Sequence, residues 1–352
     1  MDATTIAVDL AKDVFEIACA TSAGRIVERR RLSRPQFHRF LSKLPPGVEV
    51  VMEACSSAHY WGRQCQALGL VPVLLPPQYV RPYVRRNKTD RTDAEALVEA
   101  RRCGGILPVP VKTAEQQALQ SLHRVRAQWQ TARTARMNVI RGLLREYGLP
   151  LRAGAVTIRR AVPRLLADEN AALPQVVRQL VEHLLEEIGE LEARVRALDH
   201  QLRAVADADP VTRRLQTVPG VGPLVATGFL GSVPHIHAFR RGRSFASWLG
   251  LTPREAASGT RQWRGGISKR GDVYLRALLT HGARSVLFNA LRRARVHADR
   301  LTALQRWVVQ LANRRGYNKA VSALANKLAR IVWAVWRREI DFKAESSLQA
   351  AM

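Results

Sequence analysis

The stretch Thr5-Ile6-Ala7-Val8-Asp9-Leu10 is an apolar run that carries a carboxylate near its end. A second run, Val48-Glu49-Val50-Val51-Met52-Glu53, ends in a carboxylate in the same way. Short apolar runs rich in β-branched residues are typical of buried β-strands. We therefore expect Asp9 and Glu53 at the ends of two strands. Taken alone, either acid has a plain structural explanation as a strand-end or capping residue.

Two further acids, Asp90 and Asp93, open a helical stretch at residues 90–103 that Gly104-Gly105 ends. Residues three apart lie on one face of a helix, although Asp90 could also simply cap it. Hard cations such as Mg²⁺ prefer carboxylate oxygens and suit phosphodiester chemistry, because a metal activates the nucleophile and stabilises the leaving oxygen. Taken together, Asp9, Glu53, Asp90 and Asp93 predict a magnesium site.

Residues 1–105 are predicted to form a mixed α/β domain. Its β-rich runs lie near residues 4–10, 13–20, 25–32, 47–53 and 70–75, and its helical stretches near 35–44, 58–69 and 90–103. This order of elements is that of an RNase H-like sheet, in which the first and fourth strands end side by side. The last helix packs across those ends. The order therefore predicts that the four acids meet in space.

Composition indicates a polyanionic partner. The 352 residues include 56 Lys and Arg against 29 Asp and Glu, a formal net charge of +27. Such an excess favours nucleic acid as the partner. The four cysteines lack metal-ligand spacing, so neither structural zinc nor a disulfide framework is expected, and a reducing cytoplasm fits. No signal peptide and no run of 18 apolar residues is present, so we expect no membrane anchor.

Residues 106–205 are predicted to be helical. The segment 113–147 is rich in arginine without acidic partners at i+4, which favours polyanion contact over a solvated face. From residue 177, apolar residues recur at alternating spacings of four and three, which indicates a coiled-coil seam. The seam positions are Val177, Val181, Leu184, Ile188, Leu191, Val195, Leu198, Leu202 and Val205. The seam could pair with 113–147 of the same chain or with another protomer.

Residues 206–352 are predicted to be mainly helical and carry most of the positive charge. The turn Val218-Pro219-Gly220-Val221-Gly222 resembles a helix-hairpin-helix element, whose backbone N–H groups can approach a phosphate. Such turns also join apolar helices without any ligand. The candidate nucleic-acid contacts of the whole chain are Arg124, Arg133, Arg136, Gly220, Gly222, Arg254, Arg261, Lys269 and Arg270.

Ser258 lies in a predicted loop, Ala257-Ser258-Gly259-Thr260. Composition alone does not indicate a catalytic role for this serine, because Ser-Gly dipeptides are common in turns. A serine hydroxyl attacks phosphorus only after activation by a base or a metal. No histidine lies close to Ser258 in sequence, so the metal of the acidic set would have to be brought to it by folding or by assembly.

Several of these segments together carry a family resemblance. They are Val8-Asp9-Leu10-Ala11-Lys12, Met52-Glu53-Ala54, Asn87-Lys88-Thr89-Asp90-Arg91-Thr92-Asp93-Ala94, Val218-Pro219-Gly220-Val221-Gly222, Gly250-Leu251-Thr252-Pro253-Arg254, Ser258-Gly259, Ile267-Ser268-Lys269-Arg270-Gly271-Asp272 and Leu275-Arg276. In this order they resemble the DEDD transposases of bacterial insertion sequences. The resemblance is to the one-ten family and its eleven-eleven subgroup, which are bridge-RNA-guided serine recombinases, and it covers nearly the whole chain.

The resemblance implies three domains: a RuvC-like (RNase H fold) metal-binding catalytic domain at 1–105, a helical coiled-coil linker and oligomerisation region at 106–205, and a C-terminal transposase domain at 206–352. It implies that Asp9, Glu53, Asp90 and Asp93 bind Mg²⁺ and that Ser258 attacks a DNA phosphate to form a phosphoserine link. A bridge RNA would pair with donor and target DNA, in dimers and tetramers where one protomer's acids meet another's serine. The implied location is the bacterial cytoplasm, at the nucleoid.

Two other functions remain compatible with the residues. A RuvC-like junction-resolving nuclease would use the same acids with metal-activated water, and Ser258 would be dispensable. A non-catalytic RNA- or DNA-binding scaffold would use only the basic C-terminal zone. The sequence gives neither the target and donor sequences nor the resting oligomeric state, and it assigns no role to residues 148–175.

Overall fold

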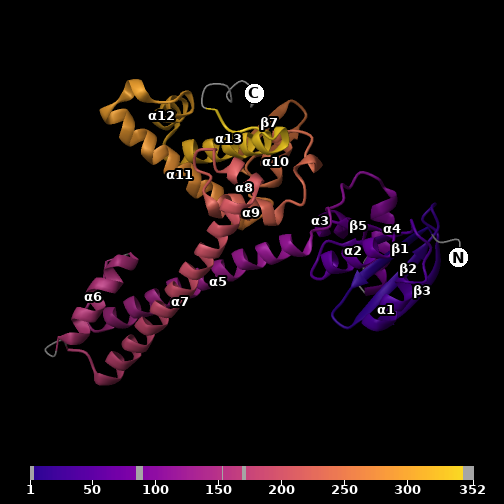
Figure 1. The fold of residues 1–352 in the computed structure, drawn as a ribbon, viewed down its shortest axis with the longest axis horizontal. Coiled ribbons are helices and arrows are strands. Elements are labelled where there is room, and N and C mark those ends of the chain that lie inside the picture. Colours follow the sequence, from indigo (N-terminus) through magenta and orange to yellow (C-terminus); the bar gives the residue numbers. More distant parts are fainter. Residues whose placement is uncertain (1–3, 85–89, 153, 169–171, 344–352) are drawn as a thin grey trace. The chain divides into compact units, whose positions relative to one another are not determined.

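The computed structural model describes residues 4–84, 90–152, 154–168 and 172–343, without the side chain of Asp90 (Figure 1). The chain divides into two compact units, residues 1–117 and residues 118–352. The sequence placed its boundaries at 105 and 205 instead. The second unit includes both zones after 117 because helix α7 packs against α8 and α9. The functional division into three domains stays a prediction.

The first unit is built on one five-stranded sheet. Its strands are β1 (Thr5–Leu10), β2 (Val14–Ala20), β3 (Ile26–Ser33), β4 (Glu49–Glu53) and β5 (Val71–Leu75). They lie in the order β3-β2-β1-β4-β5. β1, β4 and β5 run parallel, whereas β2 pairs antiparallel with β1 and β3. The turn between β2 and β3 contains Ala23-Gly24, and Gly24 adopts a φ of 81° there.

Alternation along the strands divides apolar residues between two cores, because successive side chains point to opposite faces. One core joins Ile6 and Val8 to helices α1 (Arg34–Leu41) and α2 (Ala58–Ala67). The other joins Ala7 and Val51 to α4 (Asp90–Arg102), with Val80 of the short helix α3 (Pro77–Val80). The 3₁₀ turn η1 (Arg81–Tyr83) follows α3. The sheet therefore has helices on both faces, as Figure 1 shows.

The second unit is mainly helical. It contains most of α5 (Ala114–Glu146), then α6 (Ala155–Ala167), α7 (Gln175–Ala208), α8 (Pro210–Leu215), α9 (Pro223–Ser232), η2 (Ile236–Ala238), α10 (Gly242–Trp248), α11 (Val273–Val296), η3 (Ala298–Arg300), α12 (Ala303–Arg315) and α13 (Tyr317–Arg338). The largest apolar core joins α8 to α13. Two strands, β6 (Pro253–Ser258) and β7 (Arg261–Ile267), form a separate hairpin. No helix in the described ranges is both long enough and apolar enough for a membrane span.

The predicted seam on α7 pairs within the chain. A separate apolar core joins Val177, Val181 and Ile188 of α7 to α5 and α6. The register departs from the predicted heptad, because Leu191 is only half-buried and Glu192 is buried in its place. Arg133 of α5 and Arg159 of α6 lie 3.6 and 3.3 Å from the Glu192 carboxylate. These ion pairs offset the cost of burying that charge.

Candidate metal centre and nucleic-acid interface

Asp9 and Glu53 occupy matching positions on neighbouring strands. β1 and β4 run parallel with Val8 opposite Met52, so the two acids follow at the next position on each strand. Alternation places Asp9 on the face of Ala7, and Glu53 on the face of Val51. Both of those residues pack in the core that α4 covers. The two carboxylates therefore lie side by side on the α4 face, at the edge where the parallel strands end.

The thiol of Cys55 lies within electrostatic reach of both acids. Burial raises the pKa of Cys55 above its usual range, and the negative charges of Glu53 and Asp9 raise it further. Coulomb interactions of this kind fall off with distance. A single side chain that is influenced by both carboxylates therefore supports the proximity that the strand register gives.

Asp93 lies on the sheet-facing side of α4. It stands one turn before Leu97, which is buried against the sheet, and its own Oδ1 atom is shielded from solvent. Arg101 near the other end of α4 donates hydrogen bonds of 2.9 and 2.6 Å to Glu49, the first residue of β4. Asp93 lies eight helical residues from Arg101, a rise of about 12 Å, and Glu53 lies four strand residues from Glu49, a rise of about 13 Å. This anchor therefore brings Asp93 to the level of Glu53.

The donor set suits a hard divalent cation in kind. Asp9, Glu53 and Asp93 offer only carboxylate oxygens, which such cations bind while keeping several waters. Carboxylates held close together also repel one another unless a cation lies among them. Within the described residues, no three or more His, Cys, Asp or Glu side chains already form a metal-binding group. The predicted fourth ligand, Asp90, has its side chain outside the described residues.

One acid beside this site was missed by the sequence analysis. Glu16 on β2 lies directly opposite Asp9 and shares its face of the sheet. Its carboxylate lies 3.3 Å from the guanidinium of Arg31 on β3. The signal was present in the antiparallel pairing of the first two strands, since a register drawn from the hairpin would have placed Glu16 beside Asp9.

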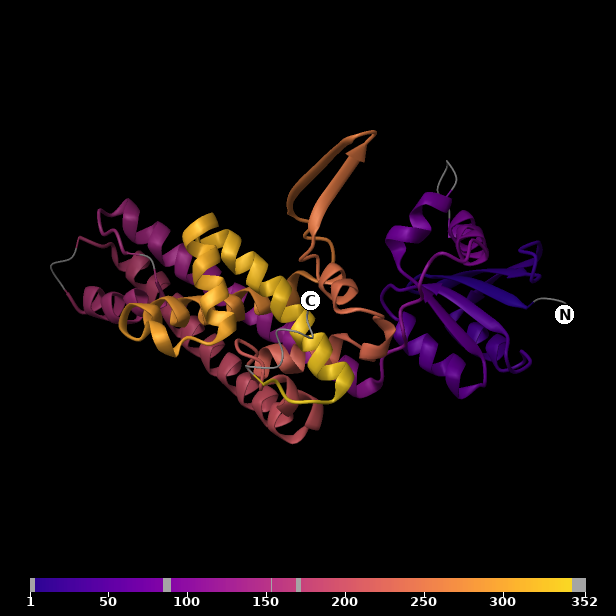
Figure 2. The same cartoon turned by 90° about the horizontal axis from the view of Figure 1, so that it is seen from above.

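Ser258 is the last residue of β6, beside the tip of the β6–β7 hairpin. It pairs with Arg261 across the turn Gly259-Thr260, and Gly259 has a φ of 56° that favours glycine. All of β6 is exposed, Ser258 included. Figure 2 shows the hairpin standing clear of the helices of its unit. The predicted loop is therefore a tight turn that presents the serine to solvent.

Close backbone crossings hold the base of this hairpin. A Cβ atom on Gly250 would lie 2.0 Å from the carbonyl oxygen of Arg270, and one on Gly271 would lie 2.0 Å from that of Trp248. The N–H of Lys269 donates to the carbonyl of Gly250 at 3.0 Å. The segments Gly250–Pro253 and Ser268–Gly271 therefore pack closely against each other. This contact fixes the point at which the hairpin leaves the helical core.

Four of the predicted nucleic-acid contacts gather on this hairpin and its base. Arg254 lies on β6, Arg261 on β7, and Lys269 and Arg270 in the segment that follows, and all four side chains are exposed. Clustered cations of this kind attract phosphate groups. The structure thus places Arg254 and Arg261 on the same hairpin as Ser258, with Lys269 and Arg270 at its base.

The arginines of α5 behave differently from the prediction. Their lack of acidic partners at i+4 does not leave them unpaired, because three of them pair with acids of α7: Arg126 pairs with Asp199, Arg133 lies 3.6 Å from Glu192, and Arg136 lies 2.7 Å from Glu187. The error arose because the sequence test considered only partners within the same helix, whereas these acids come from α7. Arg124 is exposed and lines a cavity beside α9 and α11.

The glycine turn between α8 and α9 has a packing role. Gly220 has a φ of 81°, and a Cβ atom there would lie 2.7 Å from the carbonyl oxygen of Gly282 on α11. The backbone of α11 therefore explains the glycine at 220. Gly222, the N-cap residue of α9, has open space where a side chain would be. A phosphate contact at either residue stays a prediction.

Two family models and several known proteins match the sequence of this chain. Residues 6–149, which include all four predicted acids, match a DEDD transposase model of the IS110 type. Residues 212–297, which include Ser258, match a model described as "Transposase IS116/IS110/IS902 family". The chain is 44% identical to a "Probable family 20 transposase" of Pseudomonas aeruginosa, over 97% of this chain and 99% of the relative. The chain belongs to the IS110 family of transposases.

Two further relatives agree with this assignment. The "Transposase for insertion sequence element IS1111A" of Coxiella burnetii is 39% identical over 97% of this chain and 92% of its own length. The "Transposase for insertion sequence element IS1328" of Yersinia enterocolitica is 35% identical over 94% and 96%. The matching family model is that of a DEDD transposase and the relatives are described as transposases, so the class name serine recombinase is corrected to DEDD transposase. Membership of an enzyme family also sets aside the non-catalytic scaffold.

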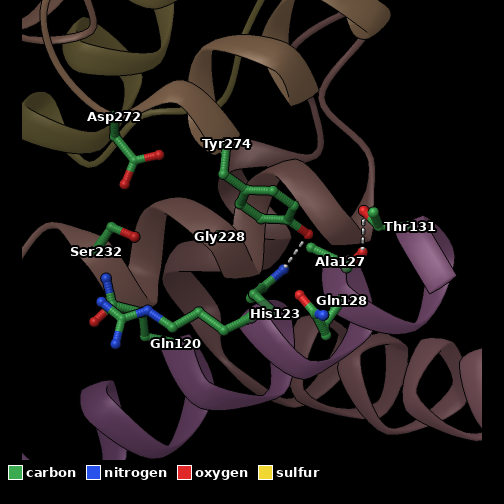
Figure 3. A pocket seen from close by; sticks show the side chains of 10 residues that line it. Gln120, His123, Ala127, Gln128, Thr131, Gly228, Ser232, Asp272 and Tyr274 are labelled. Atoms are coloured by element: carbon green, nitrogen blue, oxygen red, sulfur yellow. Dashed lines mark hydrogen bonds between the residues drawn. The ribbon is translucent and has the colours of Figure 1, made fainter.

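A buried histidine in this transposase was not singled out from the sequence. His123 of α5 lies 2.9 Å from the hydroxyl of Tyr274 (Figure 3). Its other ring nitrogen lies 3.0 Å from the hydroxyl of Thr227. The Thr227 hydroxyl donates to the carbonyl of Pro223, so it accepts from Nε2, and Nδ1 accepts from Tyr274. The histidine thereby ties α5 to α9 and α11. Its position on an arginine-rich helix gave no local signal of this role.

Acidification is expected to destabilise the second unit through His123. Burial, reinforced by the charge of Arg126, lowers its pKa to about 4. The unfolded chain binds this proton near pH 6.5, so the stability that the neutral ring contributes is present above pH 6.5 and is lost as pH falls towards 4. Between these limits the loss is about 3 kcal/mol.

Urea unfolding at pH 7.5 and pH 4.5 measures this loss. The matched variant His123→Gln has no titrating ring and should lose about 2–3 kcal/mol less than the native chain between the two pH values. The exposed His200→Gln on α7 serves as control and should follow the native chain. Equal pH dependence of the His123→Gln variant and the native chain would contradict the assignment.

Proposed function

We propose that this chain is a bacterial insertion-sequence transposase that cuts and rejoins DNA strands with Mg²⁺ held by Asp9, Glu53, Asp93 and Asp90. The observation that carries the proposal is the matched position of Asp9 and Glu53 on neighbouring parallel strands, on the face that α4 covers. The strand order β3-β2-β1-β4-β5 supports an RNase H-like, RuvC-like assignment for this unit.

In this proposal, the carboxylates bind the metal ion and the arginines of the hairpin contact DNA. Asp9 and Glu53 are held on strands whose backbones are fixed by pairing on both sides, so their carboxylates need little reorganisation to bind a cation. Mg²⁺, when bound, would activate the attacking oxygen and stabilise the leaving oxygen. The exposed cations of the hairpin, Arg254 and Arg261, would neutralise DNA phosphates.

We further propose that the attacking oxygen is the hydroxyl of Ser258. Its Oγ would form a bond to phosphorus while the bond from phosphorus to one deoxyribose oxygen breaks, and the freed sugar hydroxyl takes up the proton. Attack by a sugar hydroxyl on the phosphoserine then restores the serine and joins a new strand. The count of phosphodiester bonds is unchanged, so no external energy source is needed. Support comes from the exposure of Ser258 on a basic hairpin.

The proposed mechanism also requires assembly of several copies of the chain on DNA. Asp9 and Ser258 belong to different compact units, and we propose that dimers and tetramers on DNA unite the acids of one protomer with the serine of another. A structured bridge RNA would pair with donor and target DNA at the nucleoid. The net charge of +27 supports contact with several nucleic-acid backbones at once.

A second candidate function is junction resolution by metal-activated water. It needs functional residues of one unit only, because the carboxylate set lies in residues 1–117 and Ser258 belongs to residues 118–352. In that case the acids would act without the hairpin hydroxyl. The two candidates differ in whether any DNA becomes linked to the protein.

Removal of metal tests the function that both candidates share. Full-length protein with its flanking RNA and a plasmid carrying the element ends should cleave DNA in Mg²⁺, and EDTA should lower the rate at least about 100-fold. Added Mg²⁺ should restore the rate. DNA binding, measured by gel shift in EDTA, serves as control and should persist. Undiminished cleavage in EDTA would overturn the proposal.

A further inference from the structure

Trp263 on β7 is a large apolar side chain that the hairpin leaves in water. It is 61% exposed, whereas Trp61 and Trp336 are 2% and 8% exposed. Its ring lies along its own strand, because a Cβ atom on Gly265 would stand 2.4 Å from the ring atom Cη2. The glycine thus provides the space that the outer edge of the indole occupies beside the strand. Most of the side chain remains open to solvent.

The strand register places this indole on the same side of the hairpin as Ser258. Ser258 is opposite Arg261, and Ala256 is opposite Trp263. Opposed residues of an antiparallel pair share a face, as do residues two apart on one strand. Trp263 is therefore the diagonal neighbour of Ser258, a relation that corresponds to about 7–8 Å between Cα atoms.

Charge distinguishes the two faces of the hairpin. On the opposite face, Glu255 lies 3.4 Å from Arg264, so that pair is neutral overall. On the face of Ser258, Arg261 is exposed and has no carboxylate within ion-pair distance among the described residues. Ala256, opposite the indole, is small. The face of Ser258, Arg261 and Trp263 therefore combines a hydroxyl, a free cation and an open aromatic ring.

We propose that this face binds an unpaired DNA nucleotide, with Trp263 stacked on its base and Arg261 on a neighbouring phosphate. An aromatic ring stacks on any base because every base has a π-face, and arginine satisfies phosphate oxygens with charge-assisted hydrogen bonds. The positive charge beside the ring selects a nucleic-acid strand over an apolar protein surface. The inference rests on the proposed function, and it names Trp263 as a positioning residue that holds the strand beside Ser258.

The binding test uses full-length protein in EDTA, so that no cleavage occurs. Trp263→Ala should weaken binding of a duplex with an unpaired central bubble about 10-fold or more, the size of effect expected for one lost base–aromatic stack. Binding of the same duplex fully paired should change less than about 2-fold. Trp263→Phe should retain most of the affinity for the bubble. A 2-aminopurine placed in the bubble should be quenched by native protein and not by Trp263→Ala.

Gln262→Ala, on the opposite face of the same strand, is the matched control and should bind both duplexes as the native protein does. Equal binding of the bubble by Trp263→Ala and native protein would overturn the proposal. A change of oligomeric state without a change in DNA preference would also overturn it, and would assign the ring to a contact between copies. Failure here would leave metal-dependent cleavage intact, so it is distinguishable from failure of the proposed function.

Discussion

Replacement of Asp9 by asparagine is expected to lower the rate of DNA strand cleavage about 1,000-fold while leaving DNA affinity within a few-fold of the native value. The amide keeps the shape of the carboxylate but removes the negative charge that binds a hard cation. Loss of several kcal/mol of transition-state stabilisation corresponds to a reduction of this size. Glu53→Gln should behave alike, because Glu53 holds the matching position on β4.

Single-turnover cleavage and titration calorimetry with Mg²⁺ measure the two consequences separately. The matched control is Glu16→Gln, which removes a carboxylate from the same face of the sheet, opposite Asp9 on β2. Arg31 already balances that charge, so cleavage should stay within a few-fold of native. If Asp9→Asn cleaves as fast as the native chain, the carboxylate site is not the catalytic one. If Glu16→Gln is equally defective, the ligand set is wrong.

Replacement of Ser258 by alanine is expected to remove all protein-linked DNA and to lower strand exchange by about 10⁴-fold or more, as removal of other enzymatic nucleophiles does. The fold should be unchanged, because the exposed hydroxyl contributes nothing to the apolar core, and DNA binding should therefore survive. Labelled DNA that resists separation from protein under denaturing conditions measures the adduct. Thr260→Ala, a neighbouring hydroxyl across the turn, is the control and should retain the adduct.

The same variant separates the two candidate functions. A junction-resolving nuclease would cleave at the native rate after Ser258→Ala and would show no adduct with either protein. A mixture of Asp9→Asn and Ser258→Ala proteins should regain activity if acids and serine come from different protomers. A mixture that stays inactive would contradict that arrangement of the assembly.

The sheet could be predicted because its signals are local. Asp9 and Glu53 end apolar runs, and the alternation within each run sets the strand and its buried face. The predicted order of strands and helices along residues 1–105 is also the observed order, apart from the short α3 and η1 that the structure adds between β5 and α4. These features depend on a few neighbouring residues, so the sequence alone contains them.

The remaining features depend on residues far apart in the chain. The carboxylates that pair with Arg133 and Arg136 come from α7, beyond the reach of an i+4 test. Gly220 is required by the backbone of Gly282, which lies on another helix. The position of Trp263 beside Ser258 follows from the hairpin register, and composition does not give that register. Contacts of this kind appear only when the chain is folded.

The β6–β7 hairpin is held at its base by the backbone crossings at Gly250 and Gly271, while β6 lies wholly in solvent. Amino-acid changes near its tip therefore cost the rest of the protein almost no thermodynamic stability. Variant libraries confined to this arm would sample altered strand preference without losing expression or yield. Such freedom makes the arm a practical starting point for engineering its contacts with DNA strands.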